Sequence, residues 1–255
     1  MFRRNFKMLK VSGLCKHFGD LVVLENFNLT VPHRGFTILI GPSGCGKSTL
    51  FDVLTGVLPR ECGEIYWLEK SLPHLGKKAA YMQQKDLLLP WFTLLDNALL
   101  PATIAGSDMT ISNTKAQRLF KRLGLEGFEN YLPAETSGGM RQRCALVRTL
   151  MFEHELVLLD EPLSALDAIT RTSLQSLLLL LQSEFNKSIL MITHNIDEAL
   201  MLADEVLVMG QLPMRILEHF NLSGPKPRRL NDPELIEIKE HVLSRLQDEL
   251  EDEIL

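Results

Sequence analysis

The chain has 255 residues, of which 45% are hydrophobic and 23% charged, and its formal net charge is −5. This composition excludes an intrinsically disordered chain, a collagen-like chain and a coiled coil. A chain of this length can bury most of its apolar surface without disulfide or metal staples, and its negative charge argues against duplex DNA as the main partner. We therefore expect a globular protein of one or two domains that binds no nucleic acid.

The four cysteines, Cys15, Cys45, Cys62 and Cys144, are widely spaced and include no Cys-x-x-Cys pair. They make neither a zinc pattern nor a disulfide framework, so we expect small buried or half-buried thiols in a reducing compartment. No apolar segment follows the basic N-terminus, and no uncharged window reaches the ~20 residues of a membrane-spanning helix. The sequence thus predicts a cytoplasmic protein that does not cross a membrane by itself.

Short apolar runs rich in β-branched residues alternate with helical stretches, which predicts an α/β protein. The expected strands are residues 8–14, 27–31, 37–40, 65–68, 156–160, 189–193 and 206–209. The runs at 36–40, 156–159 and 188–192 are continuously apolar, as in a parallel sheet that is covered on both faces. The strands before residue 68 alternate, which is typical of antiparallel strands with one face in water.

Between Gln84 and His154 the strand signals vanish and helical spacing takes over, interrupted by prolines. This pattern predicts a helical insertion in the α/β core. After Gly210, a link with Pro and Arg leads to a last helix, in which Asp232 is the expected N-cap and Pro233 the first residue. The apolar residues of this helix form one stripe: Leu235, Ile238, Val242, Leu246 and Leu250. The acidic residues between 248 and 253 predict a solvated, fraying terminus.

A phosphate loop is predicted where the sequence matches G-x-x-x-x-G-K-[ST] between a buried strand and an apolar helix. Its residues, with the one that follows, are Gly41, Pro42, Ser43, Gly44, Cys45, Gly46, Lys47, Ser48 and Thr49. Glycines let backbone N–H groups converge on phosphate oxygens, and the helix presents its positive end. Lys47 would reach the β- and γ-phosphates, and the Ser48 hydroxyl would bind Mg²⁺. Cys45 is expected to have no catalytic role, and the alternative is a glycine-rich turn without a ligand.

Two adjacent acids, Asp160 and Glu161, end a buried strand. Such a strand end lies beside the phosphate loop, where Asp160 can hold Mg²⁺ through its water shell. Glu161, one position further, can orient or deprotonate an attacking water. The alternative for this pair is an acidic surface turn.

A second helix N-terminus with free N–H groups is expected at Ser137, Gly138 and Gly139, directly before an apolar stripe. One chain with a single phosphate loop has no evident use for two separate phosphate-binding helix ends. Two chains that face each other do, because each can lend its Ser-Gly-Gly segment to the γ-phosphate of the other. This pattern therefore predicts a homodimer.

These motifs, followed by Ser164-Ala-Leu-Asp167 and Thr193-His194, occur in the order and approximate spacing of the ATP-binding subunits of ABC transporters. The chain resembles this family over about residues 8–210. Its segment Gln84-Lys-Asp-Leu-Leu-Leu-Pro-Trp91 is similar to the Q-loop of the nitrate, sulfonate and taurine importers.

The resemblance implies an α/β fold of the P-loop NTPase class. This fold has a mixed, largely parallel sheet, an antiparallel β subdomain at the edge and a helical insertion subdomain. A single domain, 1–255, would then comprise a nucleotide-binding core (1–83 and 155–210), a helical signature subdomain (84–154) and a C-terminal helical extension (211–255).

The resemblance also implies roles for individual residues. Phe18 would stack on adenine, although a core Phe at a strand end is the alternative. Gln84 would contact Mg²⁺ or the attacking water. His194 would bond the γ-phosphate and position the water together with Glu161.

Across a dimer interface, Ser137, Gly138 and Gly139 would bind the partner's γ-phosphate, and Asp167 would lie near the partner's phosphate loop. The chain departs from the family at Thr136, where Leu is usual, at Asn195, where Asp is common, and at Val147, where Ala is usual. These changes remove no group that bonds phosphate. They therefore bear on the rate of hydrolysis more than on whether hydrolysis takes place.

The resemblance implies an ATPase that uses ATP and Mg²⁺ and powers an importer from the cytoplasmic face of the cell membrane. Its partners would be separate membrane permease subunits and, indirectly, an extracytoplasmic solute-binding protein. Pro90, Trp91 and Phe92 would contact the permease, although the alternative is that the aromatic residues after this proline belong to the core. One alternative is a soluble ABC ATPase of DNA repair or translation, which usually carries a long coiled coil or two cassettes. A P-loop kinase or GTPase would leave the Ser-Gly-Gly segment and His194 unexplained.

Overall fold

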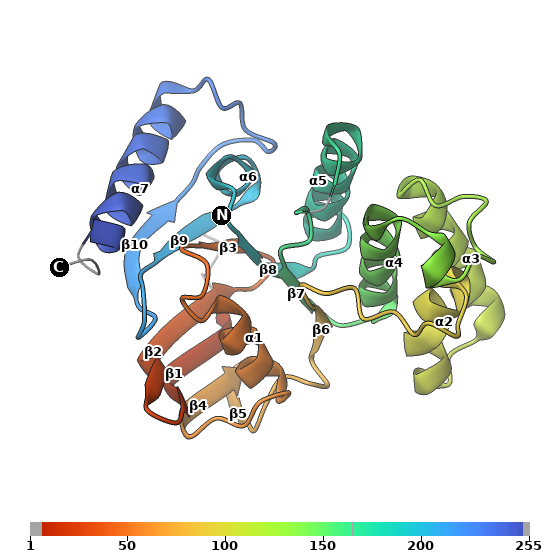
Figure 1. Ribbon diagram of the computed structural model, residues 1–255, viewed down its shortest axis with the longest axis horizontal. Helices are drawn as coiled ribbons and strands as arrows, with labels where there is room; N and C mark the ends of the chain where they lie inside the picture. The colour runs from red at the N-terminus through yellow and green to blue at the C-terminus, as the bar shows by residue number, and fades with distance from the viewer. Residues whose placement is uncertain (1–6, 165, 252–255) are drawn as a thin grey trace.

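The computed structural model describes residues 7–164 and 166–251, which form two β-sheets and their covering helices (Figure 1). The larger sheet consists, in spatial order, of β10 (Ile216–Asn221), β9 (Glu205–Met209), β3 (Phe36–Ile40), β8 (Ser188–Thr193), β7 (Leu156–Asp160) and β6 (Ala79–Met82). All pairs in it are parallel except β9 with β10. The predicted mixed, largely parallel sheet is confirmed.

The three continuously apolar runs are β3, β7 and β8, and every residue in them is buried. Successive residues of a strand point to opposite faces of the sheet. In β7, Val157 and Leu159 therefore join the hydrophobic core on one face, whereas Leu158 joins the core on the other. A strand that contributes to two cores needs apolar side chains on both faces, and the polar residue of β7, Asp160, lies at its end.

The smaller sheet is antiparallel, as the alternating strands predicted, and its order is β2 (Leu21–Pro32), β1 (Lys7–Phe18), β4 (Cys62–Trp67) and β5 (Lys70–Leu72). Helix α1 (Lys47–Thr55) contributes to the core that this sheet shares with the larger one, mainly through Leu50, Phe51 and Leu54. Strands β5, β6 and β10 are not among the predicted strands, because the first two are very short and the apolar residues of β10 alternate with polar ones.

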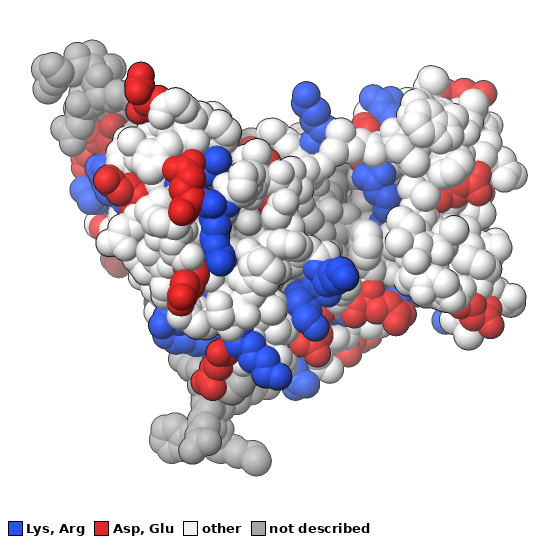
Figure 2. All heavy atoms as spheres, turned by 90° about the horizontal axis from the view of Figure 1, so that it is seen from below, with Lys and Arg blue, Asp and Glu red and all other residues white. Residues whose placement is uncertain are grey.

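Beyond β6, the helices α2 (Leu94–Ala105), α3 (Met109–Arg122) and α4 (Gly138–Met151) form a separate lobe together with the 3₁₀ turn at Pro133–Glu135 (Figure 1). This lobe is the predicted helical insertion, although Pro101 lies inside α2 rather than at a break. Figure 2 shows a hollow between the lobe and the rest of the molecule, with Lys and Arg side chains on both sides of it.

Three further helices cover the larger sheet: α5 (Ala168–Ser183), α6 (Ile196–Leu202) and α7 (Pro233–Glu251). Asp232 accepts a hydrogen bond from the Glu234 amide at 3.1 Å, so the predicted start of α7 is confirmed. The stripe residues Leu235 and Val242 are buried, and the side chain of Leu250 lies outside the described residues. Within the described part of the chain, no helix is both long and apolar enough to span a membrane.

The predicted fraying of the acidic end is wrong for Glu249, which is buried. Its carboxylate accepts two hydrogen bonds from the Arg215 guanidinium, at 2.9 and 3.1 Å. Nη2 of Arg215 donates to both carboxylate oxygens, and this charged pair holds the end of α7 against the turn that precedes β10. Asp248 is exposed, as predicted, whereas the side chain of Glu251 and residues 252 and 253 lie outside the described residues.

The prediction of four free thiols is wrong for two of the cysteines, because Cys15 and Cys62 form a disulfide bond. They are 47 residues apart in the sequence, but they are direct partners in the antiparallel register of β1 and β4. Register is set by the sheet and not by sequence spacing, so spacing alone gave no signal. Cys45 and Cys144 are buried free thiols, as predicted.

Leu190 lies fully buried in the middle of β8, so its replacement by Ala leaves a cavity in the hydrophobic core. We expect Leu190→Ala to lower the free energy of unfolding by about 2–5 kcal/mol. The control is Ile169→Ala on α5, where the side chain is 82% exposed and the change should stay within about 0.5 kcal/mol. Urea unfolding of both variants measures this, and equal losses would contradict the assignment of the core.

Candidate nucleotide-binding site

Four parts of the predicted site lie at the carboxyl ends of four neighbouring strands. In the order β3-β8-β7-β6 the strands run in one direction, so these ends meet at one edge of the sheet. The phosphate loop follows β3, His194 follows β8, Glu161 follows β7, and Gln84 lies just beyond β6. Ligands of open α/β sheets bind at such an edge.

The phosphate loop turns directly into α1, as predicted. Gly46 caps this helix in the left-handed conformation, with φ at 103°, and a Cβ there would lie 2.7 Å from Cγ1 of Val23. Only glycine fits this position, on both grounds. The Lys47 ammonium donates hydrogen bonds to the carbonyl oxygens of Gly41 at 3.0 Å and Pro42 at 2.6 Å. The loop therefore already encloses one positive charge.

Asp160 is a buried carboxylate, only 2% exposed, so the alternative of an acidic surface turn is wrong. Burial raises the pKa of Asp160, and the negative charges of Glu161 and Asp52 add to this. A hydrogen bond with Ser48 and the charge of Lys47 act in the opposite direction and lower the pKa. A buried anion of this kind gains stability from a bound cation.

The oxygen ligands of Asp160 and Ser48 fit Mg²⁺, which prefers hard oxygen donors. Among the residues that the structure describes, no group of three or more His, Cys, Asp and Glu side chains is placed to hold a metal ion. In nucleotide sites Mg²⁺ takes one or two carboxylates and completes its shell with phosphate oxygens and water. The residues present fit that mode of binding.

Glu161 and His194 face each other, with Oε2 of the carboxylate 3.3 Å from Nδ1 of the imidazole. Glu161 has a φ of 49°, a left-handed conformation that is rare for a residue with a side chain. Its amide donates to the Ile192 carbonyl at 3.0 Å, and its own carbonyl accepts from Gln142 and from Ser164, both at 3.0 Å. These bonds hold a strained backbone that directs the carboxylate toward His194.

A polar cavity of about 40 Å³ lies beside this pair and is lined by Glu161, His194, Arg171 and Glu198, among others. Its size is enough for water. Glu198 is buried, accepts a hydrogen bond from Thr193 Oγ1 at 2.8 Å and has a pKa raised by burial. Glu198 is not among the predicted site residues, although it lies four residues after His194 at the start of a helix.

Ser137 caps α4, and its Oγ accepts a hydrogen bond from the Met140 amide at 3.3 Å. Gly138 and Gly139 are the first residues of the helix, and the amides of a first turn have no partner within the helix. The predicted second helix N-terminus is thus present. Thr136, the residue that departs from the family pattern, donates from Oγ1 to the Pro133 carbonyl at 2.9 Å.

Two arginines of α4 bind the loop after Gln84, and neither is among the predicted site residues. Arg141 Nε lies 3.0 Å from Oδ2 of Asp86. Arg148 donates to the carbonyl oxygens of Leu87 at 2.8 Å and Asp86 at 2.7 Å. Gln84 itself is exposed. The position of this loop therefore depends on α4.

Phe18 is 46% exposed, so the alternative of a core residue is wrong. The Lys16 ammonium lies 5.2 Å from its ring centroid. Asp167 caps α5 by accepting hydrogen bonds from the amides of Ile169 and Thr170, and these bonds lower its pKa. In the described residues, no hydrogen bond or ion pair links Phe18, Ser137 or Asp167 to the phosphate loop. Ala165, which lies between Ser164 and Asp167, is outside the described residues.

Comparison with known proteins identifies relatives along nearly the whole chain. A family model described as ABC transporter matches residues 24–164. The taurine import ATP-binding protein TauB of Escherichia coli strain K12 is 37% identical over 252 residues, which are 96% of this chain and 99% of that protein. The TauB protein of Shigella flexneri is 36% identical over the same shares.

Solved structures agree with the fold. The ATP-binding cassette MJ0796, in a dimeric post-hydrolysis state bound to ADP and Pi, has a TM-score of 0.78 and 27% identity, covering 86% of this chain and 100% of that one. A nucleotide-free ATP-binding cassette from an ABC transporter, at 23% identity, has a TM-score of 0.74 over 91% of this chain and 98% of that one, which supports the fold alone.

These findings confirm the predicted P-loop NTPase fold and the resemblance to the nitrate, sulfonate and taurine importer group. The match extends well beyond the motifs, since it includes the helical lobe and most of the C-terminal segment. The chain therefore belongs to the ABC transporter family and is one of its ATP-binding, ATP-hydrolysing cassettes.

Proposed function

We propose that two copies of this chain enclose two ATP molecules, hydrolyse them, and thereby drive solute uptake through separate membrane subunits. The observation that carries the proposal is the contact of Glu161 with His194 at the sheet edge that also bears the phosphate loop. A carboxylate and an imidazole next to a phosphate site can orient and deprotonate an attacking water.

In this proposal the phosphates bind to the amides of the phosphate loop, Gly41 to Thr49, and to the N-terminus of α1. Lys47 exchanges its bonds to loop carbonyl oxygens for bonds to the β- and γ-phosphates. Glu161 accepts a proton from the attacking water, while His194 and Lys47 stabilise charge on the γ-phosphate oxygens. When bound, Mg²⁺ would neutralise charge between the β- and γ-phosphates, held by Ser48, Asp160 and Gln84.

The second half of each site would come from the partner chain. Ser137, Gly138 and Gly139 lie at an exposed helix N-terminus that is suited to an anion. Asp167 would lie near the partner's phosphate loop, and the exposed Phe18 ring would stack on adenine. The related cassette MJ0796 is dimeric with ADP and Pi. Loss of the γ-phosphate removes the anion that both chains bind, so hydrolysis favours the open dimer.

The single domain would comprise the core (1–83 and 155–210), the helical subdomain (84–154) and the C-terminal extension (211–255). Coupling to a membrane permease would pass through the helical subdomain. Trp91 is 69% exposed and Leu87 52% exposed, beside the loop that Arg148 fastens to α4. A permease helix that docks there, with Pro90 and Phe92 as neighbours, would move Gln84 relative to the core.

The chain would then work at the cytoplasmic face of the membrane, and an extracytoplasmic solute-binding protein would act on it through the permease. The TauB relatives are named for taurine import. We extend this to a small organic sulfonate as the class of solute.

Glu161→Gln should retain ATP binding but hydrolyse ATP about 10²–10⁴-fold more slowly, because the amide cannot accept the proton of water. The trapped nucleotide should then hold two chains together. Size-exclusion chromatography with ATP, with ADP and without nucleotide should show a dimer with ATP alone. Hydrolysis at the wild-type rate would remove Glu161 from this role. If the variant stays monomeric with ATP, Thr136→Leu in the same background tests whether the second phosphate site is weakened.

Lys47→Ala should weaken ATP binding roughly tenfold or more, because a hydrogen bond to a charged group is worth about 1.5–3 kcal/mol. Isothermal titration calorimetry with ATP measures the change. Lys70→Ala, which removes an equal charge from an exposed position on β5, is the matched control and should bind like the wild type. Equal affinities for both variants would contradict the assignment of the phosphate loop.

Asp160→Asn should raise the melting temperature of the nucleotide-free protein at neutral pH. Burial raises the pKa of Asp160, so its ionised form opposes folding at every pH above that raised value, and removal of the charge stabilises by about 0.5–2 kcal/mol. The gain should vanish below the usual pKa of an aspartate, where the carboxyl is protonated in both states. The same variant should lose the stabilisation that Mg²⁺ with ATP gives to the wild type.

Asp167→Asn is the contrasting control, because backbone hydrogen bonds lower the pKa of Asp167. An acid with a lowered pKa stabilises the fold above its usual pKa, so this variant should not gain stability at neutral pH. Thermal melts of both variants between pH 3 and pH 8, scanned with and without Mg²⁺ and ATP, separate the two cases. A lower melting temperature for Asp160→Asn at neutral pH would contradict the burial argument.

A further inference from the structure

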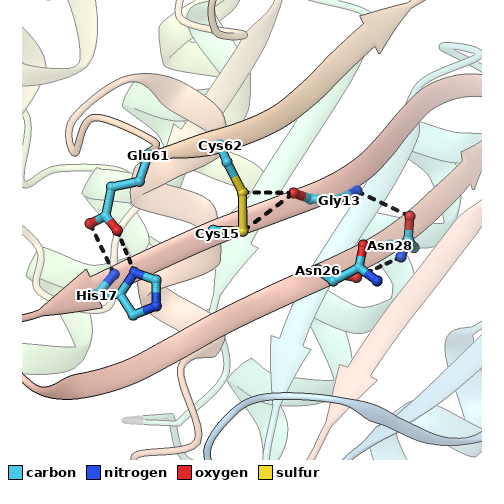
Figure 3. The surroundings of a disulfide bond; sticks show 7 residues. All are labelled: Gly13, Cys15, His17, Asn26, Asn28, Glu61 and Cys62. Carbon is cyan, nitrogen blue, oxygen red and sulfur yellow. Dashed lines mark hydrogen bonds and ion pairs between the residues drawn. A yellow bond between two sulfur atoms is a disulfide. The ribbon is translucent and has the colours of Figure 1, made fainter.

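The disulfide between Cys15 and Cys62 joins the paired strands β1 and β4 (Figure 3). Their Cα atoms are 5.0 Å apart, and β1 has a register shift between Ser12 and Cys15. Gly63 has a φ of 85°, and a Cβ there would lie 2.4 Å from the Gly13 carbonyl oxygen. A side chain at position 63 would therefore push the two strands apart. Glycine at this position allows the close approach of the strands beside the disulfide.

The disulfide is also the last register pair between β1 and β4. The next residues of β1, Lys16 to Phe18, pair with β2. Glu61, directly before Cys62, connects these residues to the β4 side. Its carboxylate accepts hydrogen bonds from Lys16 Nζ at 3.2 Å and from the His17 amide at 3.0 Å. The same carboxylate contacts Nδ1 of His17 (Figure 3). The hydrogen bonds of His17 and then Lys16 lower the pKa of Glu61 to about 2.

These contacts link the disulfide to the exposed ring of Phe18, and we call this series of contacts the path. The disulfide fixes Cys62 against β1, the adjacent Glu61 holds Lys16 and His17, and the Lys16 ammonium lies over the Phe18 ring. Without the bond between the sulfur atoms, two ties would hold the end of β1 to this side: the backbone hydrogen bond that the Glu61 amide donates to the Cys15 carbonyl at 3.2 Å, and the exposed side chain of Glu61. Exposed ion pairs contribute little to stability, so Phe18 would be held less firmly.

We propose that Cys15 and Cys62 are a reversible thiol–disulfide site that sets the affinity of the cassette for ATP through the position of Phe18. The proposal rests on the proposed function, in which Phe18 stacks on adenine. Cys62 is exposed and Cys15 half-buried, so a small molecule can reach the pair. The reactants are a low-molecular-weight disulfide of the glutathione type for oxidation and its thiol, or a dithiol, for reduction.

The exchange balances in two steps. The Cys62 thiolate attacks one sulfur of the small disulfide, which forms a mixed disulfide and releases one small thiolate. The Cys15 thiolate then attacks Sγ of Cys62, which forms the bond between the two cysteines and releases the second small thiolate. Two cysteine thiols are oxidised, one small disulfide is reduced to two thiols, and the two protons pass to those thiolates or to water.

The test compares ATP binding by the full-length wild type after treatment with oxidised glutathione and after treatment with dithiothreitol. Mass spectrometry after alkylation counts the free thiols of each sample, and calorimetry gives the dissociation constant for ATP. We expect the oxidised form to bind about fivefold or more tightly, the lower end of what loss of a base–aromatic stack costs. Cys15→Ser/Cys62→Ser is the matched control, because it keeps the free thiols Cys45 and Cys144 and should not respond to either reagent.

Phe18→Ala identifies the path, since it should bind ATP weakly in both redox states while its disulfide still forms and breaks. Equal affinities of the two wild-type forms would overturn the proposal and leave the bond a structural crosslink. So would alkylation of both cysteines after treatment with the oxidant, or a redox response that persists in the serine variant. Absence of ATP binding in every sample would overturn the proposed function first, and the proposal with it.

Discussion

The parallel pairing of β3, β8, β7 and β6 is the constraint on which the rest of this structure depends. Because the four strands run in one direction, their carboxyl ends bring the phosphate loop, His194, Glu161 and Gln84 to one edge. Parallel strands are covered on both faces, which explains why every residue of β3, β7 and β8 is buried and most of them are apolar. The same apolar surroundings bury Asp160 and raise its pKa, which prepares this carboxylate for a cation.

Helix α4 connects that edge to the helical lobe. Its N-terminus bears the Ser-Gly-Gly segment, and Gln142 in its second turn donates to the backbone of Glu161. Arg141 and Arg148, one and three turns from the start of the helix, hold the loop that follows Gln84. A displacement of α4 would thus act on both the acid at the end of β7 and the loop beyond β6. This geometry gives a physical route by which a partner docked on the lobe could influence the reacting phosphate.

Much of the site could be predicted because its chemistry resides in contiguous segments: a glycine-rich loop, two adjacent acids, and a histidine after a buried strand. The pairs that could not be predicted join segments that only the fold brings together. Cys15 and Cys62 are partners across two strands, Gln142 reaches Glu161 from another subdomain, and Glu249 meets Arg215 from beyond the edge of the sheet. Strand β6 was missed because four residues with two alanines carry too little apolar signal.

The position of α7 has a consequence for the behaviour of the protein in concentrated solution. β10 is an edge strand, and such an edge presents unpaired backbone groups on which a strand of another molecule can add. Figure 1 shows α7 beside β10; Arg245 of this helix forms an ion pair with Glu218 of the strand, and Nε2 of His241 lies 3.4 Å from the same carboxylate. We therefore expect α7 to hinder edge-to-edge aggregation, and we expect a chain shortened before α7 to pair through β10 with other molecules more readily.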